Sequence, residues 1–112
     1  MNTQGWIRGM VAKNMEPEKF FYHVVECFGR EFEVSSSANK TDGGYSIKLG
    51  EYECSVSLEK AASLQQKGAY TLDRYLLDQF RAKGFDFEVT RSQYIMYCYN
   101  IFPEIIQKKY NM

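Results

Sequence analysis

The sequence of 112 residues has no long apolar run and no leader-like start. A membrane-spanning helix needs about 20 consecutive apolar residues, and no stretch approaches that length. Residues 1–15 lack the continuous apolar core of a signal peptide. These absences predict a protein that does not associate with a membrane and that stays in the cytoplasm.

Cysteine is scarce and unpaired. Cys27, Cys54 and Cys98 are an odd number and form no CxxC motif. A secreted disulfide framework uses an even number of cysteines, and a zinc site uses closely spaced pairs. The sequence therefore predicts reduced thiols, no metal site and no cofactor.

Catalytic motifs are also missing. His23 is the only histidine and precedes Cys27 by four residues, so the two share a face if this segment is helical. A Cys–His pair can supply a nucleophile and its base, but no third group is evident to orient the imidazole. Glycine-rich phosphate loops and the GxSxG motif are absent. A small Cys/His enzyme is therefore the least favoured hypothesis.

The sequence has no excess of either charge, because fourteen acidic residues balance fourteen basic ones. A protein that binds nucleic acid strongly without regard to sequence needs a basic surplus, and a DNA mimic needs an acidic one. The balanced charge therefore predicts that the protein belongs to neither of these two classes. A net charge near zero also favours self-association, which predicts a homo-oligomer.

The clearest helix signal lies between Pro17 and Gly29. Proline suits the first helical turn and glycine the position after the last turn. Apolar residues recur here at the spacing of one helix face, namely Phe21, Val24, Val25 and Phe28. Residues 1–15 fit three descriptions: a strand, a frayed helix, or an arm that docks on a neighbouring copy.

A period of two then predicts strands. Residues 30–35 alternate in polarity, and residues 36–44 resemble a polar turn region. Residues 45–49 and 52–58 alternate clearly around Gly50, which fits a tight hairpin turn. The pattern predicts a three-stranded antiparallel meander with one apolar face. Residues 85–89 alternate again and are a candidate fourth strand.

Helical patterns return after the meander, at residues 58–67, 71–83 and 90–102. Thr71 is expected to cap the second of these helices, while Thr90 and Gln93 resemble a capping box for the third. Residues 103–112 form a short tail. The sequence thus predicts a single α+β domain over residues 1–112, with an N-terminal helix, the meander, and a C-terminal cluster of helices packed on one sheet face.

Aromatic residues make up 16% of the chain, and many cluster near its end. In the helix predicted for residues 90–102, one apolar face consists of Ile95, Cys98, Tyr99 and Phe102 and is expected to be core. The surplus residues Tyr94, Tyr97 and Asn100 are expected to face a partner or a ligand. Arginine can grip a phosphate and tyrosine can stack on a base, so further candidates are Tyr70, Arg74, Arg81 and Arg91.

These observations favour a non-catalytic protein that binds its target stoichiometrically. The leading hypothesis is a small inhibitor of the phage or mobile-element type, such as an anti-defence or immunity protein. Such a protein acts by masking a functional surface of a host or competitor protein. The alternative is an oligomeric binder that sequesters a nucleotide-like small molecule through tyrosine and arginine contacts.

Overall fold

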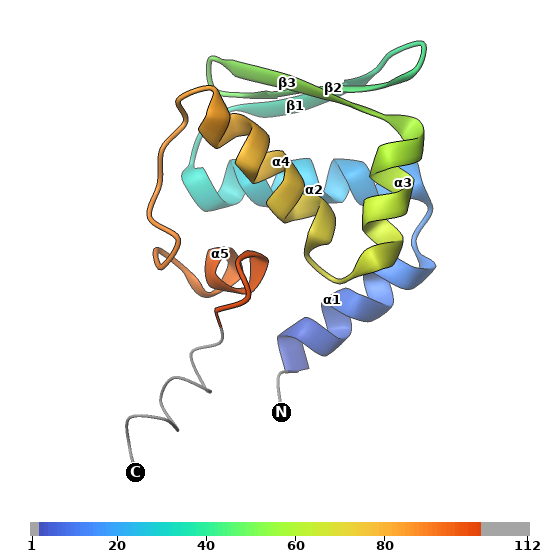
Figure 1. The fold of residues 1–112 in the computed structure, drawn as a ribbon, viewed down its shortest axis with the longest axis vertical. Helices are drawn as coiled ribbons and strands as arrows, with labels where there is room; N and C mark the ends of the chain where they lie inside the picture. Colours follow the sequence, from blue (N-terminus) through green and yellow to red (C-terminus); the bar gives the residue numbers. More distant parts are fainter. Residues whose placement is uncertain (1–2, 102–112) are drawn as a thin grey trace.

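A computed structural model describes the backbone of residues 3–101 and the side chains of residues 7–101. Figure 1 shows a sheet lying along one side of the molecule, with the helices gathered on its inner face. The elements in chain order are α1 (Thr3–Asn14), α2 (Pro17–Phe32), β1 (Ser36–Lys40), β2 (Gly44–Leu49), β3 (Tyr52–Ser57), α3 (Leu58–Lys67), α4 (Thr71–Ala82) and α5 (Gln93–Cys98). The α+β fold predicted from the sequence is confirmed.

The sheet is a three-stranded antiparallel meander in the order β1-β2-β3. Its register pairs Ile47 with Ala38 on one side and with Cys54 on the other. Alternate side chains of β2 point inward, so Tyr45, Ile47 and Leu49 are buried, as their period of two predicts. α2 packs against β1 and α4 against β3 on this inner face (Figure 1).

The first strand was predicted in the wrong place. α2 continues three residues beyond Gly29 to Phe32, and Glu33 ends it in the left-handed conformation, with φ 53°. Gly29 does not end the helix. A side chain is excluded there because a Cβ would lie 2.3 Å from the Ser36 hydroxyl oxygen. A glycine at this position allows α2 to approach β1 closely.

β1 itself falls on residues 36–40, within the stretch expected to be a polar turn region. Its residues are small or polar and its side chains are exposed or half-buried, so no apolar alternation marks it in the sequence. Backbone pairing with β2 makes it a strand. A period of two in a sequence arises when alternate side chains are buried, and the side chains of this strand are little buried.

The candidate fourth strand is also wrong: residues 85–89 do not form a strand. Phe85 and Phe87 instead place their rings 4.9 and 5.2 Å from that of Phe32. Phe85 also lies 5.4 Å from the ring of Tyr52 on β3. The alternation of this segment thus reflects packing against α2 and β3 and not membership of the sheet.

The starts of the C-terminal helices differ from the prediction at α4 and α5. The Ser57 hydroxyl accepts a hydrogen bond from the Lys60 N–H at the start of α3. The predicted cap Thr71 is instead the first residue of α4. The predicted capping box at Thr90 is wrong, since the Ser92 hydroxyl caps α5 by accepting from the Ile95 N–H.

α5 is shorter than the helix expected over residues 90–102 and ends by a specific device. Asn100 adopts a left-handed conformation with φ 59°. The Ile101 N–H donates to the Met96 carbonyl at 2.7 Å, and the Asn100 N–H donates to the Tyr97 carbonyl at 3.2 Å. These two bonds form a Schellman motif, in which asparagine is a favoured substitute for glycine. Phe102 and the predicted tail 103–112 lie outside the described residues.

The N-terminal segment is a helix that packs on its own chain. Ala12 is 2% exposed, and the Gln65 side-chain amide donates to the carbonyls of Ala12 and Met15, both at 2.8 Å. These contacts attach α1 to α3. The expectation of a strand is therefore wrong for residues 3–14.

The helices and sheet enclose one apolar core. Its largest fully buried apolar side chains come from α2, β2, α4 and α5: Phe20, Phe21, Phe28, Ile47, Leu49, Leu72, Leu76, Leu77, Phe80 and Ile95. Cys54 and Cys98 are buried small residues, as their positions on apolar faces predict. Within the described part of the chain, each helix is too short or too polar to span a bilayer.

Candidate functional site

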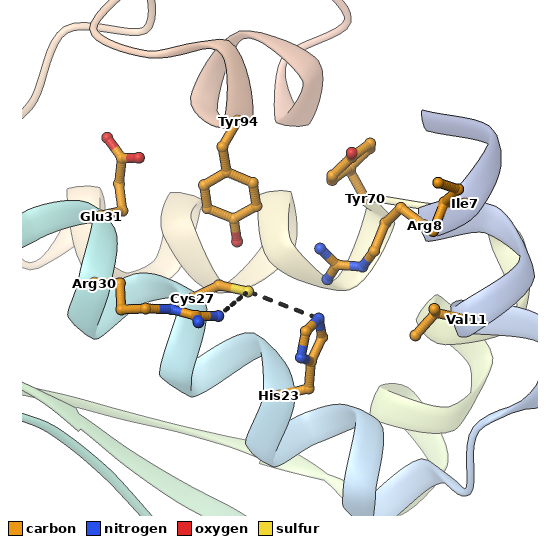
Figure 2. Close-up of a pocket in the computed structure, with 9 residues that line it drawn as sticks. All are labelled: Ile7, Arg8, Val11, His23, Cys27, Arg30, Glu31, Tyr70 and Tyr94. Carbon is orange, nitrogen blue, oxygen red and sulfur yellow. Dashed lines mark hydrogen bonds between the residues drawn. The ribbon is translucent and has the colours of Figure 1, made fainter. Parts of the chain in front are cut away.

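A pocket opens between α1, α2 and the start of α5, on the side of α2 away from the sheet. Its volume is about 760 Å³, and Figure 2 shows the side chains around it. α1 contributes Ile7, Arg8 and Val11; α2 contributes His23, Cys27, Arg30 and Glu31; Tyr70 and Tyr94 complete the lining. One face of α2 packs against the sheet. The polar residues on its other face line the pocket.

Arg8 is the central charged group of the pocket. Its guanidinium donates to both carboxylate oxygens of Asp73 at 2.8 Å, and both side chains are almost wholly buried. Tyr94 donates its hydroxyl proton to the same carboxylate in a short hydrogen bond. This network joins α1, α4 and α5. Burial is the largest single influence and lowers the pKa of Arg8, but the charge and hydrogen bonds of Asp73, together with Tyr94 and Cys27, raise it by more in total, so the pKa of Arg8 is raised.

Two aromatic rings sandwich the Arg8 guanidinium. Its central carbon lies 5.0 Å from the Phe20 ring centre and 5.1 Å from that of Tyr70. Cation–π contacts of this kind stabilise a guanidinium that has lost its water. Burial raises the pKa of Tyr70 to about 12, so its hydroxyl stays protonated. Among the described residues, the Arg8 Nε–H is buried without a hydrogen-bond partner.

His23 and Cys27 meet on the pocket floor, as their spacing predicts. The Cys27 Sγ lies 3.8 Å from His23 Nε2 and 3.8 Å from an Arg30 guanidinium nitrogen (Figure 2). Burial raises the pKa of the Cys27 thiol, and burial together with Arg8 lowers the pKa of His23. At neutral pH the pair is therefore a thiol beside a neutral imidazole, and not the thiolate that nucleophilic catalysis uses.

Glu31 closes one end of the pocket with its charge already satisfied. Its carboxylate accepts from Arg91 at 2.8 Å and from the Ser92 hydroxyl at 2.9 Å. The Arg91 guanidinium also lies 4.7 Å from the ring centre of Phe32. Arg30, one residue before Glu31, is exposed and forms no ion pair with a described carboxylate.

The candidate residues from the sequence are only partly brought together. Tyr70 and Tyr94 line the pocket, and Arg91 reaches it through Glu31. Arg74 and Arg81 lie apart from the pocket, where their guanidiniums are 5.1 and 5.8 Å from the ring centre of Tyr99.

A carboxylate completes that second cluster. Asp78 accepts a 2.8 Å hydrogen bond from the Tyr99 hydroxyl and lies 3.8 Å from Arg74. The arginine side chains here cover aromatic rings, which is a common surface arrangement. The sequence suggested one phosphate-binding site, but the structure places its candidate tyrosines and arginines in two separate clusters.

Tyr97 and Asn100 differ from expectation in their surroundings. Tyr97, which was expected to face a second subunit or a ligand, is only 2% exposed in the chain itself. Its ring lies 5.8 Å from that of Tyr70, and its hydroxyl accepts from the Gln93 side chain at 3.0 Å. Asn100 is exposed at the end of α5, where its backbone conformation explains its presence. A binding role for either residue stays a prediction.

The sequence analysis missed Arg8, Arg30 and Asp73. One signal was available for Asp73, which falls on the same helical face as Leu76, Leu77 and Phe80. A carboxylate on an apolar face must have a partner. The identity of that partner was not available, because Arg8 precedes Asp73 by 65 residues.

No cluster of three or more histidine, cysteine or acidic side chains suited to a metal ion occurs within the described part of the chain. Comparisons with protein-family models, with curated proteins and with solved structures found no match to this chain. The functional argument therefore depends on the geometry and chemistry of the pocket.

Proposed function

We propose that this chain is a non-catalytic binding protein that sequesters a small, nucleotide-like molecule in the pocket between α1, α2 and α5. The observation that carries the proposal is the pocket itself. Its volume of about 760 Å³ lies in the range of small-molecule sites, which combine apolar walls with a few polar groups. Ile7, Val11 and Tyr70 supply apolar surface here, and Arg8 and Arg30 supply charge.

The chemistry on the pocket floor supports binding in preference to catalysis. A cysteine nucleophile is activated by a depressed pKa or by a base that is oriented by a third group. Here burial raises the pKa of Cys27, and the nearest His23 nitrogen is 3.8 Å from the sulfur. The carboxylate of Asp73 is engaged by Arg8 and Tyr94, and no contact joins it to the imidazole of His23 among the described residues.

Thermal shift with a panel of nucleotides and neutral aromatic fragments tests this proposal. A ligand that binds only the folded state raises the melting temperature. Val11→Phe should abolish the shift by filling the pocket. Met10→Phe is the matched control, because Met10 lies on the same helix, is 47% exposed and does not line the pocket. An identical response of both variants, or no response of the wild type to any compound, would contradict the proposal.

A second candidate is an inhibitor that masks a partner protein. The observation that favours it is the exposure of apolar side chains on α1: Met10, outside the pocket, is 47% exposed, and Ile7, which also lines the pocket, is 52% exposed. Large exposed apolar side chains on one helix face are typical anchors of an interface. Met10→Asp should then abolish co-purification of a larger partner and leave small-molecule binding unchanged. Retention of the partner by this variant would exclude α1 as the docking face.

A further inference from the structure

The charges around the pocket do not cancel. Three guanidinium groups lie at or beside it, those of Arg8, Arg30 and Arg91, against the two carboxylates of Asp73 and Glu31. Asp73 pairs with Arg8, and Glu31 pairs with Arg91, each at 2.8 Å. Arg30 remains as one positive charge without a counter-ion among the described residues.

Arg30 is placed to use that charge inside the pocket. Figure 2 shows its side chain running along α2 toward Cys27, with the guanidinium beside the sulfur. A cysteine thiol is a weak hydrogen-bond acceptor, so this contact leaves the donors of Arg30 available for a stronger one. A guanidinium presents paired N–H groups that match the oxygens of a carboxylate or a phosphate.

Both arginines act on a side chain that lines the pocket. The charges of Arg8 and Arg30 both add to burial in lowering the pKa of His23, although Asp73 and Glu26 act in the opposite sense. Arg8 also keeps a buried Nε–H without a partner among the described residues. A buried donor without an acceptor is costly, but this nitrogen is closed off by its surroundings and Asp73 already pairs with Arg8, so Arg30 is the guanidinium that an entering oxyanion can reach.

The remaining walls are suited to an apolar body. Ile7 and Val11 present aliphatic surface on the α1 side, and Tyr70 presents a ring. The Tyr94 hydroxyl is engaged by Asp73 and adds no free donor. A ligand with several charges would lack partners here, whereas a neutral one would leave Arg30 unpaired.

We infer that the pocket takes a ligand with one oxyanion group, a carboxylate or a phosphate, on a planar or apolar body, and that Arg30 pairs with the oxyanion. This inference rests on the proposed function and specifies its ligand class. Arg8 is held by Asp73 and adds positive potential behind the oxyanion. The body of the ligand contacts Val11 and Tyr70.

Benzoate and benzamide test the inference, because they share a ring and differ in charge. The full ¹⁵N-labelled chain is titrated with each, with inorganic phosphate, and with sodium chloride at matched ionic strength. The Nε–H cross-peaks of Arg8 and Arg30 and the amide signal of Val11 are followed. Benzoate is expected to bind at least about 10-fold more tightly than benzamide, the scale of one charge-assisted contact.

Substitutions at Arg30 test whether this arginine causes the preference for benzoate over benzamide. Arg30→Gln should reduce benzoate affinity to that of benzamide, and Arg30→Lys should keep part of the difference. Arg30 is exposed, so these variants should remain folded. Arg81→Gln is the control, since Arg81 is an exposed arginine beside Phe87 and Tyr99, and it should leave both affinities unchanged.

Several results would overturn the inference. They are equal affinities for benzoate and benzamide in the wild type, an undiminished preference for benzoate in Arg30→Gln, and no movement of the Arg30 signal with benzoate or phosphate beyond that caused by chloride. If neutral fragments still raise the melting temperature and Val11→Phe blocks them, the proposed function stands and only the oxyanion assignment fails. If no compound responds to Val11→Phe, the proposed function fails as well.

Discussion

Arg8 and Asp73, separated by 65 residues in the sequence, form a buried ion pair in which the guanidinium donates to both carboxylate oxygens at 2.8 Å. The pair connects the N-terminal helix α1 to the first turn of α4. Tyr94 adds α5 to the same carboxylate. The walls of the pocket are thus held together by one buried polar network, and the position of α1 depends on it.

Asp73→Asn should destabilise the protein severely. The substitution leaves the Arg8 guanidinium buried without a counter-charge, and breaking one partner of a buried pair costs about 3–5 kcal/mol. Asp78→Asn is the matched control, because its ion pair with Arg74 is half exposed at 3.8 Å and such pairs contribute about 0–1 kcal/mol. Chemical denaturation at neutral pH measures both free energies of unfolding. Similar losses in the two variants would show that the Arg8–Asp73 pair is not a structural centre.

Two adjacent glycines should respond differently to alanine. A Cβ on Gly44 would lie 2.1 Å from the Val56 carbonyl oxygen and 2.8 Å from the Ser57 Cα, both backbone atoms of β3. Overpacking of this kind costs about 1–3 kcal/mol. A Cβ on Gly43 meets nothing within 4 Å, so Gly43→Ala should be neutral or stabilise by up to about 1 kcal/mol. Equal melting temperatures for the two variants would contradict the pairing of β2 with β3 at this end.

The stability of the fold should depend on pH through His23. Burial, Arg8 and Arg30 lower the folded-state pKa of His23 below its ordinary value of 6.5, against smaller opposing effects of Asp73 and Glu26. As the pH falls below about 6.5, the unfolded chain takes up a proton that the folded chain does not, so stability is lost. Unfolding of the wild type and of His23→Gln at pH 7.5 and 5.5 separates this contribution.

The wild type should lose more stability than His23→Gln over that interval. An NMR titration of the imidazole should give a midpoint below 6.5. A midpoint at or above 6.5 would contradict the lowering of the pKa of His23 by burial and by the charges of Arg8 and Arg30.

Asn100 should be replaceable by glycine and not by a β-branched residue. Asparagine and glycine tolerate its left-handed conformation, with φ 59°, whereas a β-branched residue pays about 1–2 kcal/mol to adopt it. Asn100→Val should therefore lower the free energy of unfolding by about that amount, and Asn100→Gly should leave it unchanged. Neither variant should alter ligand affinity. A loss of binding in a stable Asn100→Gly variant would restore this residue to the binding site.

The sequence predicts those parts of the fold in which burial is periodic. α2 and the strands β2 and β3 carry regular apolar patterns, and each lies close to its predicted place. β1 carries no such pattern because it is a polar edge strand, and residues 85–89 alternate for reasons of packing. Local patterns cannot separate these cases, because the deciding contacts are made with distant residues.

The candidate site was predictable only in its local part. The i, i+4 spacing brings His23 and Cys27 together, as the sequence indicates. Two of the predicted candidates, Tyr70 and Tyr94, line the pocket, and their binding role stays a prediction. The pairing of Arg8 with Asp73 and of Arg91 with Glu31 depends on how α1 and α5 pack, and these tertiary contacts decide which arginine keeps an unpaired charge.

Crystals of the protein soaked with the tightest-binding oxyanion compound test the central claim most directly. The account predicts that the compound occupies the pocket between α1, α2 and α5, with its oxyanion on Arg30 and its ring against Val11. Occupancy instead beside Tyr99, between Arg74 and Arg81, would contradict the account and favour the alternative arginine cluster as the binding site.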